Sequence, residues 1–154
     1  MRVALLLAIA LASGDRPRLP SEFPVKIGPF KFGDTYGEVK SKCEKLGKKV
    51  RDGKPRFELW DNGGLICRSV WTGLPYLPGA PDLRFALEGG RVRTIGSKLD
   101  IEILADYVRQ IRDQTGDGHH LTDGMVCADF TDGLGSICVD MSGSTMMFMA
   151  SFVK

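Results

Sequence analysis

Four widely spaced cysteines, Cys43, Cys67, Cys127 and Cys138, constrain this 154-residue chain more than any other feature. Zinc sites and thiol redox sites commonly use pairs of cysteines separated by two residues, and the sequence has no such pair. An even number of cysteines without metal spacing favours disulfides, with free buried thiols and a metal site as the less favoured alternatives. We therefore predict a disulfide-bonded domain without a metal or other cofactor.

The first fourteen residues have the layout of a secretory signal peptide. Arg2 precedes the apolar run Val3–Ala12, and the small residues Ser13 and Gly14 follow it. The alternative is a hydrophobic first strand or helix. The run is about half of the ~20 residues that a membrane-spanning helix needs, which argues against stable insertion in a membrane. These features predict a secreted or periplasmic protein, in a compartment where disulfides persist.

Length and charge limit the number of domains and the classes of partner. The sequence divides into a signal peptide (residues 1–14), a Pro-rich extended segment (15–32) and a single domain (33–154). A formal net charge of +2 gives no bulk argument for nucleic-acid binding. The basic segment 40–56 could meet an anionic partner, but a solvated helix face is the simpler interpretation.

Two segments have helical patterns. Thr35 and Glu38 have the spacing of a capping box, and Val39, Cys43 and Leu46 form one apolar stripe behind it. A helix is therefore predicted over 34–47. A second apolar stripe predicts another helix over 100–115.

The strand-like segments come in hairpins with Gly-rich turns. They are Arg56–Trp60, Leu65–Val70, Leu83–Glu88, Arg91–Leu99, Met125–Phe130, Ile137–Met141 and Thr145–Val153. The predicted fold is α+β, with two helices packed on one face of a mainly antiparallel sheet. A short echo between segments 60–67 and 130–138 suggests a duplicated helix-plus-sheet unit. The last strand is apolar on both faces, so it is either central in the sheet or part of a binding surface.

The predicted hairpin around residues 131–136 places Cys127 opposite Cys138, within disulfide reach. Cys43, on the first helix, would then pair with Cys67. The mixed pairings remain the alternatives.

No catalytic motif stands out. The two histidines, His119 and His120, lie near Asp117 and Asp123, where a metal or a proton shuttle can be imagined. A polar surface loop is the simpler interpretation. The preferred function is therefore a secreted or periplasmic binding module that recognises another macromolecule, with a protein as the favoured partner, in an inhibitor-like or envelope-assembly role. A small secreted hydrolase with a site near these histidines is the alternative function, and a passive envelope component is another.

The preferred contact residues for a macromolecular partner are Trp71, Tyr76, Met147 and Met149. The two aromatic residues lie in a Pro/Gly-rich stretch that can present large rings at low entropic cost. The two methionines lie on the apolar last strand, and methionine-rich surfaces adapt to partners. The alternative is that the aromatic loop folds back over the core.

The first predicted helix begins with Gly33-Asp34-Thr35, followed by Glu38, Val39, Cys43 and Gly47. This pattern resembles the helix entry of small secreted α+β modules, such as the β-lactamase inhibitory protein and the small envelope-assembly lipoproteins. Those families usually have Gly-Met-Thr here, and Asp34 replaces the methionine. The resemblance implies helices on one face of a sheet and a protein partner on the other. It carries over no individual functional residue.

Overall fold

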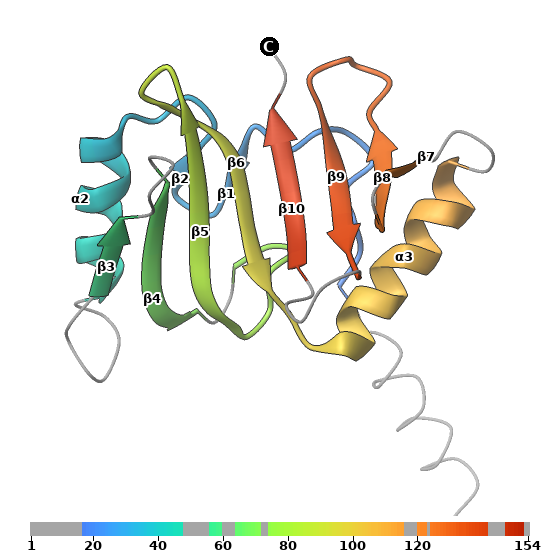
Figure 1. The fold of residues 1–154 in the computed structure, drawn as a ribbon, viewed down its shortest axis with the longest axis horizontal. Helices are drawn as coiled ribbons and strands as arrows, with labels where there is room; N and C mark the ends of the chain where they lie inside the picture. The colour runs from blue at the N-terminus through green and yellow to red at the C-terminus, as the bar shows by residue number, and fades with distance from the viewer. Residues whose placement is uncertain are drawn as a thin grey trace, which may run out of the picture.

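The protein folds around one large antiparallel sheet (Figure 1). The computed structural model describes residues 17–47, 56–59, 64–71, 74–115, 120–122, 124–141 and 147–152. The eight strands of the sheet are β3 (Arg56–Leu59), β4 (Leu65–Trp71), β5 (Ala80–Glu88), β6 (Arg91–Lys98), β7 (His120–Thr122), β8 (Met125–Asp129), β9 (Gly135–Asp140) and β10 (Met147–Phe152). Their order across the sheet is β3-β4-β5-β6-β10-β9-β8-β7. The predicted α+β class is confirmed.

The strand order shows an internal duplication. Helix α2 (Tyr36–Gly47) precedes the meander β3 to β6, and helix α3 (Ile101–Thr115) precedes the meander β7 to β10. Each helix contacts the second strand of its own meander, α2 on β4 and α3 on β8. The final strands of the two units, β6 and β10, pair antiparallel at the centre. The last strand is therefore central, as its two apolar faces suggested.

The sequence echo that suggested this duplication aligns the wrong strands. It equates Cys67, on β4, with Cys138, on β9. The topological counterpart of β4 is β8, because both are second strands and both receive the helix. The two segments look alike because each combines a Gly-rich turn with an apolar strand.

A strand lies where the sequence suggested only a loop. His120–Thr122 forms β7, which pairs with β8 and places Leu121 opposite Val126. Gly124, in the connection, has a φ of 82°. An Asp-Gly pair before an apolar strand is a strong hairpin signal, and residues 123–124 carry it. The second unit therefore has four strands, like the first.

The two helices begin and pack as their sequences predict. The capping box of α2 is formed: the backbone N–H of Thr35 donates to Glu38 Oε2 (2.8 Å), and that of Glu38 donates to Thr35 Oγ1 (3.3 Å). Val39 and Cys43 are fully buried beneath this helix. Helix α3 buries Leu104, Tyr107 and Ile111 in the same core cluster.

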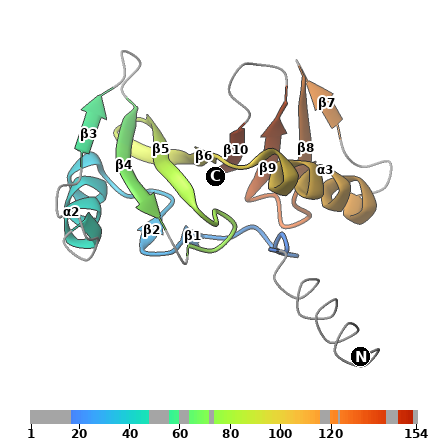
Figure 2. The same cartoon turned by 90° about the horizontal axis from the view of Figure 1, so that it is seen from below.

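Residues 17–32, here called the strap, cross the sheet on the side of the helices and lie between them (Figure 2). The strap contains the short hairpin β1 (Lys26–Ile27) and β2 (Phe30–Lys31). It adds Leu19, Phe23, Ile27 and Phe30 to the hydrophobic core. The extended N-terminal segment is thus part of the packed domain, and it fills the space that two helices leave on an eight-stranded sheet.

Candidate functional site

The strand register separates the two faces of the sheet. On the face toward the helices and the strap, apolar side chains from neighbouring strands are buried together. These are Leu65, Cys67, Leu83, Phe85, Ile95, Val126, Ile137 and Val139. The alternate positions belong to the opposite face, which no described helix or strap residue covers (Figure 2). We call this side the open face.

One row of paired residues runs across the whole open face, from one edge strand to the other. In order of pairing, its members are Glu58, Ile66, Arg84, Gly96, Met149, Cys138, Cys127 and His120. In the adjacent row, Met147 pairs with Lys98 and with Asp140. The two methionines predicted to contact a partner thus occupy register positions near the middle of the open face.

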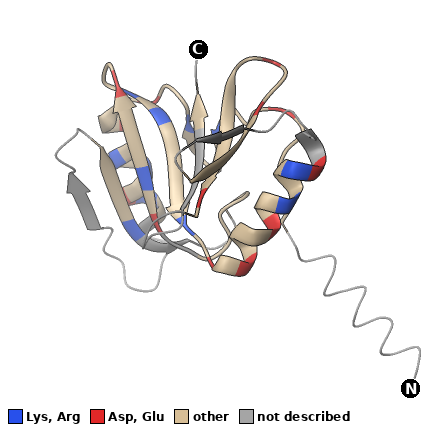
Figure 3. Ribbon diagram, turned by 45° about the vertical axis from the view of Figure 1, so that its right-hand side comes forward, with Lys and Arg blue, Asp and Glu red and all other residues tan. Residues whose placement is uncertain are grey.

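The two halves of the open face differ in charge. By register, Arg68, Arg84 and Lys98 lie on the half built from the first unit, whereas β8 and β9 carry Asp129 and Asp140 and no lysine or arginine. Figure 3 shows the acidic and basic residues on the ribbon. Within the basic half, Arg84 forms an ion pair with Asp82 at 3.6 Å. The half built from the first unit is therefore mainly basic, and the half built from β8 and β9 is acidic.

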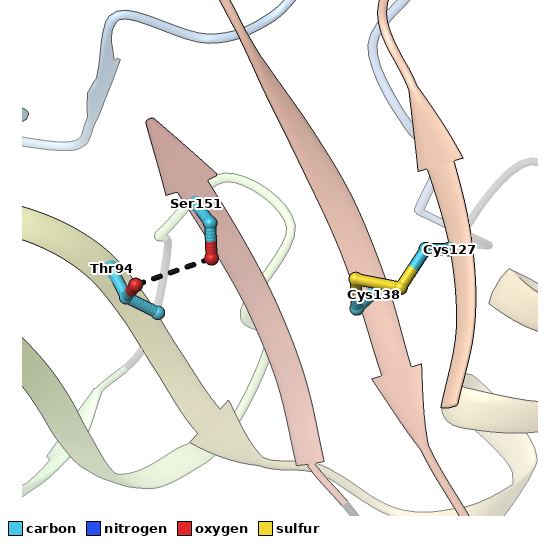
Figure 4. The surroundings of a disulfide bond; sticks show 4 residues. All are labelled: Thr94, Cys127, Cys138 and Ser151. Atoms are coloured by element: carbon cyan, nitrogen blue, oxygen red, sulfur yellow. Dashed lines mark hydrogen bonds between the residues drawn. A yellow bond between two sulfur atoms is a disulfide. The ribbon is translucent and has the colours of Figure 1, made fainter. Parts of the chain in front are cut away.

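At the seam between the two units, the hydroxyls of Thr94 and Ser151 lie 3.2 Å apart and share a hydrogen bond (Figure 4). Thr94 belongs to β6 and Ser151 to β10, and the two residues are paired in register. This contact joins the two units on the open face. It fixes small polar groups at the centre of the surface.

Both predicted disulfides are formed, and they lie on opposite faces. Cys43 pairs with Cys67 and joins α2 to β4 within the core. Cys127 pairs with Cys138 across the β8–β9 hairpin, in the central row of the open face (Figure 4). The free-thiol alternative is excluded, since none of the four cysteines is unpaired. Two disulfides point to an oxidising, non-cytoplasmic environment.

Tyr76 lies on the other side of the sheet from this disulfide. Its carbonyl oxygen accepts a hydrogen bond of 2.6 Å from the hydroxyl of Tyr107, on α3. The following residue, Leu77, is fully buried, and Tyr76 itself is partly buried against the core. At Tyr76 and Leu77 the chain therefore packs on the helix side of the sheet. The structure does not bring Tyr76 together with the positions of Met147 and Met149.

The backbone conformation of Tyr76 and the pKa of its hydrogen-bond donor, Tyr107, are both unusual. Tyr76 has a φ of 66°, a left-handed conformation that is uncommon outside glycine. Burial, with a smaller contribution from the charge of Asp106, raises the pKa of the Tyr107 hydroxyl well above its ordinary value. Tyr107 is therefore protonated under all physiological conditions and donates steadily to the Tyr76 carbonyl.

Several predicted site residues lie partly or wholly outside the described part of the chain. Trp71 ends β4 and pairs with Ala80, but its side chain is not described. His119, Asp117 and Asp123 lie outside the described residues, and His120 is placed only by its backbone, opposite Cys127. Among the described residues, no group of three or more His, Cys, Asp or Glu side chains is arranged to hold a metal ion.

The sequence pattern predicts part of the open face. Phe85 and Leu87 alternate with polar or small residues along β5, which is the signature of a strand with one buried face. The same alternation in β9, where Ile137 and Val139 flank Cys138, puts the disulfide on the side of the sheet opposite the core cluster. Counting residues from the hairpin turn gave the pairing of the cysteines but not their face.

Comparison of the chain with family models, with curated proteins and with solved structures finds no match. In the described part of the chain, no helix combines the length and apolar character needed to cross a bilayer.

Proposed function

We propose that this protein is a secreted or periplasmic binding module that holds another protein against the open face of its sheet. One observation carries the proposal: both helices and the strap lie on the same side, leaving the other face of eight strands without a described covering element. An antiparallel sheet tolerates one solvated face, so such a fold is stable while it presents a broad surface.

The size of the open face supports a protein partner. Eight strands spaced by about 4.8 Å span roughly 34 Å, and a strand of six residues is roughly 20 Å long. The resulting area is on the order of 700 Å², close to the ~800 Å² that each partner contributes to a standard protein interface. A small-molecule ligand would instead call for a concave pocket.

The chemistry of the face also suits a protein. Oppositely charged halves orient a partner during encounter and select its register more than they add raw affinity. Methionine positions at the centre add adaptable apolar groups between those halves. The resemblance of the α2 entry to small secreted modules implies the same arrangement, with helices on one face and a protein on the other.

The test compares matched charge changes on the two faces. Lys98→Glu and Ser136→Arg alter the open face, whereas Lys45→Glu and Ser41→Arg make the same changes on exposed positions of α2. Each variant is immobilised and exposed to the extracellular or periplasmic fraction of the host, and the captured protein is identified and its affinity measured. We expect the open-face changes to weaken capture by about ten-fold or more and the helix changes to leave it unchanged. Equal effects on both faces, or no capture by the wild type, would contradict the proposal.

A further inference from the structure

We propose that the Cys127–Cys138 disulfide is a site of thiol–disulfide exchange, and that it forms a mixed disulfide with a small thiol through Cys138. The Cys43–Cys67 disulfide would remain intact under the same native conditions. This reactivity is independent of the proposed binding function, because it needs only a thiolate and the folded protein.

The two disulfides differ in burial. Cys43 and Cys67 are both fully buried, between helix α2 and the core face of β4. Cys127 retains 3 % of its surface, and Cys138 is partly exposed. Exchange requires a thiolate to approach a disulfide sulfur, so access separates a reactive disulfide from an inert one. Only the Cys127–Cys138 bond offers a partly exposed partner.

The location of this bond adds to the contrast. It lies on the open face, in the central row, and no described helix or strap residue stands above it. The Cys43–Cys67 bond ties helix α2 to the sheet, whereas the Cys127–Cys138 bond ties two strands that are already adjacent. A small thiol can therefore reach it without displacing any described element.

The hairpin that carries the bond is also held by other interactions. The strands β8 and β9 pair over five residue positions. The turn is closed by the Phe130 N–H, which donates to the Gly135 carbonyl (3.0 Å), and by Asp132, whose Oδ1 accepts from the Leu134 N–H (2.9 Å). On the opposite face, apolar residues of both strands are buried in the core. Opening the disulfide therefore leaves the fold in place.

The exchange is a balanced substitution at sulfur. A thiolate attacks Sγ of Cys138, because this is the more exposed residue of the pair. The new bond joins the incoming sulfur to Cys138, the Cys127–Cys138 bond breaks, and its electron pair leaves on Cys127 as a thiolate. The thiolate of a second small-thiol molecule can then attack the small-thiol sulfur of the mixed disulfide. This step releases the disulfide of the small thiol and leaves Cys138 as a thiolate. The small thiol is the reductant, and the protein disulfide is reduced.

The first experiment uses the full oxidised chain and glutathione as the probe. Samples taken over time at pH 7.5 are quenched with acid, alkylated and mapped by peptide mass, while circular dichroism follows the fold. We expect glutathione on Cys138 and alkylation of Cys127 at least about ten-fold faster than any reaction at Cys43 or Cys67, without loss of secondary structure. The proposal is overturned by equal rates at the two disulfides, by earlier reaction of the buried one, by attachment to Cys127, or by no reaction in the folded protein.

A second arm separates a small thiol from a protein thiol as the source. A reduced dithiol protein of the thioredoxin type replaces glutathione. Equal or slower opening than with glutathione assigns the site to small thiols, whereas opening only by the protein dithiol overturns that assignment. The variant Cys127→Ala/Cys138→Ala is the control: under the same treatment it should acquire no glutathione. Uptake at the wild-type rate would show that the reaction occurs elsewhere.

Discussion

The ring of Phe23 occupies the space that a side chain at Gly135 would need. A Cβ atom added to Gly135 would meet the ring of Phe23 and the backbone carbonyl oxygen of Ser151. Phe23 comes from the strap, and its ring also contacts Phe32, Phe130 and Phe152. A glycine at the start of β9 thus lets the strap lie close to the central strands, and this contact couples the N-terminal segment to the second unit.

Gly135→Ala should therefore destabilise the protein. The added methyl group has to displace a backbone oxygen or an aromatic ring in a packed core, which costs about 2–3 kcal/mol. Gly37→Ala is the matched control, because Gly37 lies in α2 with nothing within 4 Å of its added Cβ. That change should be neutral or stabilise by about 0.5 kcal/mol. Urea unfolding of both variants gives the comparison, and equal midpoints would show that the strap moves away without cost.

Asp132 should anchor the strap to the β8–β9 turn. Its Oδ2 accepts from the backbone N–H of Phe23 (3.2 Å), and its Oδ1 accepts from that of Leu134 (2.9 Å). Asp132→Ala removes both acceptors, and we expect a loss of about 1–2 kcal/mol. Amide hydrogen exchange at Phe23 should accelerate more than the loss of global stability alone explains. The control is Asp113→Ala, an exposed carboxylate on α3. Unchanged exchange at Phe23 would mean that packing alone holds the strap.

Tyr107 should make the stability sensitive to alkaline pH. Its pKa is raised in the folded state by burial, so the folded protein keeps the proton when the unfolded chain, with an ordinary pKa near 10, loses it. The contribution is complete below about pH 10 and is lost as the pH rises above that value. Tyr107→Phe should abolish this component and remove the hydrogen bond to Tyr76, at a cost of about 1–2 kcal/mol at neutral pH. Urea unfolding of both proteins between pH 8 and pH 11 measures it, and parallel curves would contradict the assignment.

Local patterns in the sequence predicted most of the fold. The capping box at Thr35 and the apolar stripe behind it specify α2, because both depend on residues only a few positions apart. The pairing of Cys127 with Cys138 also follows from one hairpin. The strap was harder to assign, since its extended shape is visible in the prolines but its packing depends on Asp132 and Gly135, which are distant in sequence.

The candidate site was less predictable than the fold, for the same physical reason. A partner surface is defined by which residues share a face, and this depends on the register of strands from both units. Met149 and Cys138 are neighbours on the open face only because β10 inserts between β6 and β9. Tyr76 was attractive as an aromatic residue among prolines, yet the hydrogen bond from Tyr107 holds its loop on the helix side. No local sequence pattern predicts that Met149 lies beside Cys138 or that Tyr107 binds the Tyr76 carbonyl.

Export of the protein leads to a direct prediction on its mass. If residues 1–14 act as a signal peptide, the chain recovered from its own host should lack the first 12–14 residues. Thiol alkylation should add nothing before reduction and should label four cysteines after reduction and unfolding, because both disulfides are formed. Intact mass spectrometry, with and without reduction, measures both properties in one sample. A full-length chain with four alkylated thiols would contradict export and would place the protein in a reducing compartment. A full-length chain with two disulfides would separate the two properties: the oxidising environment would stand, and the assignment of a cleaved signal peptide would be wrong.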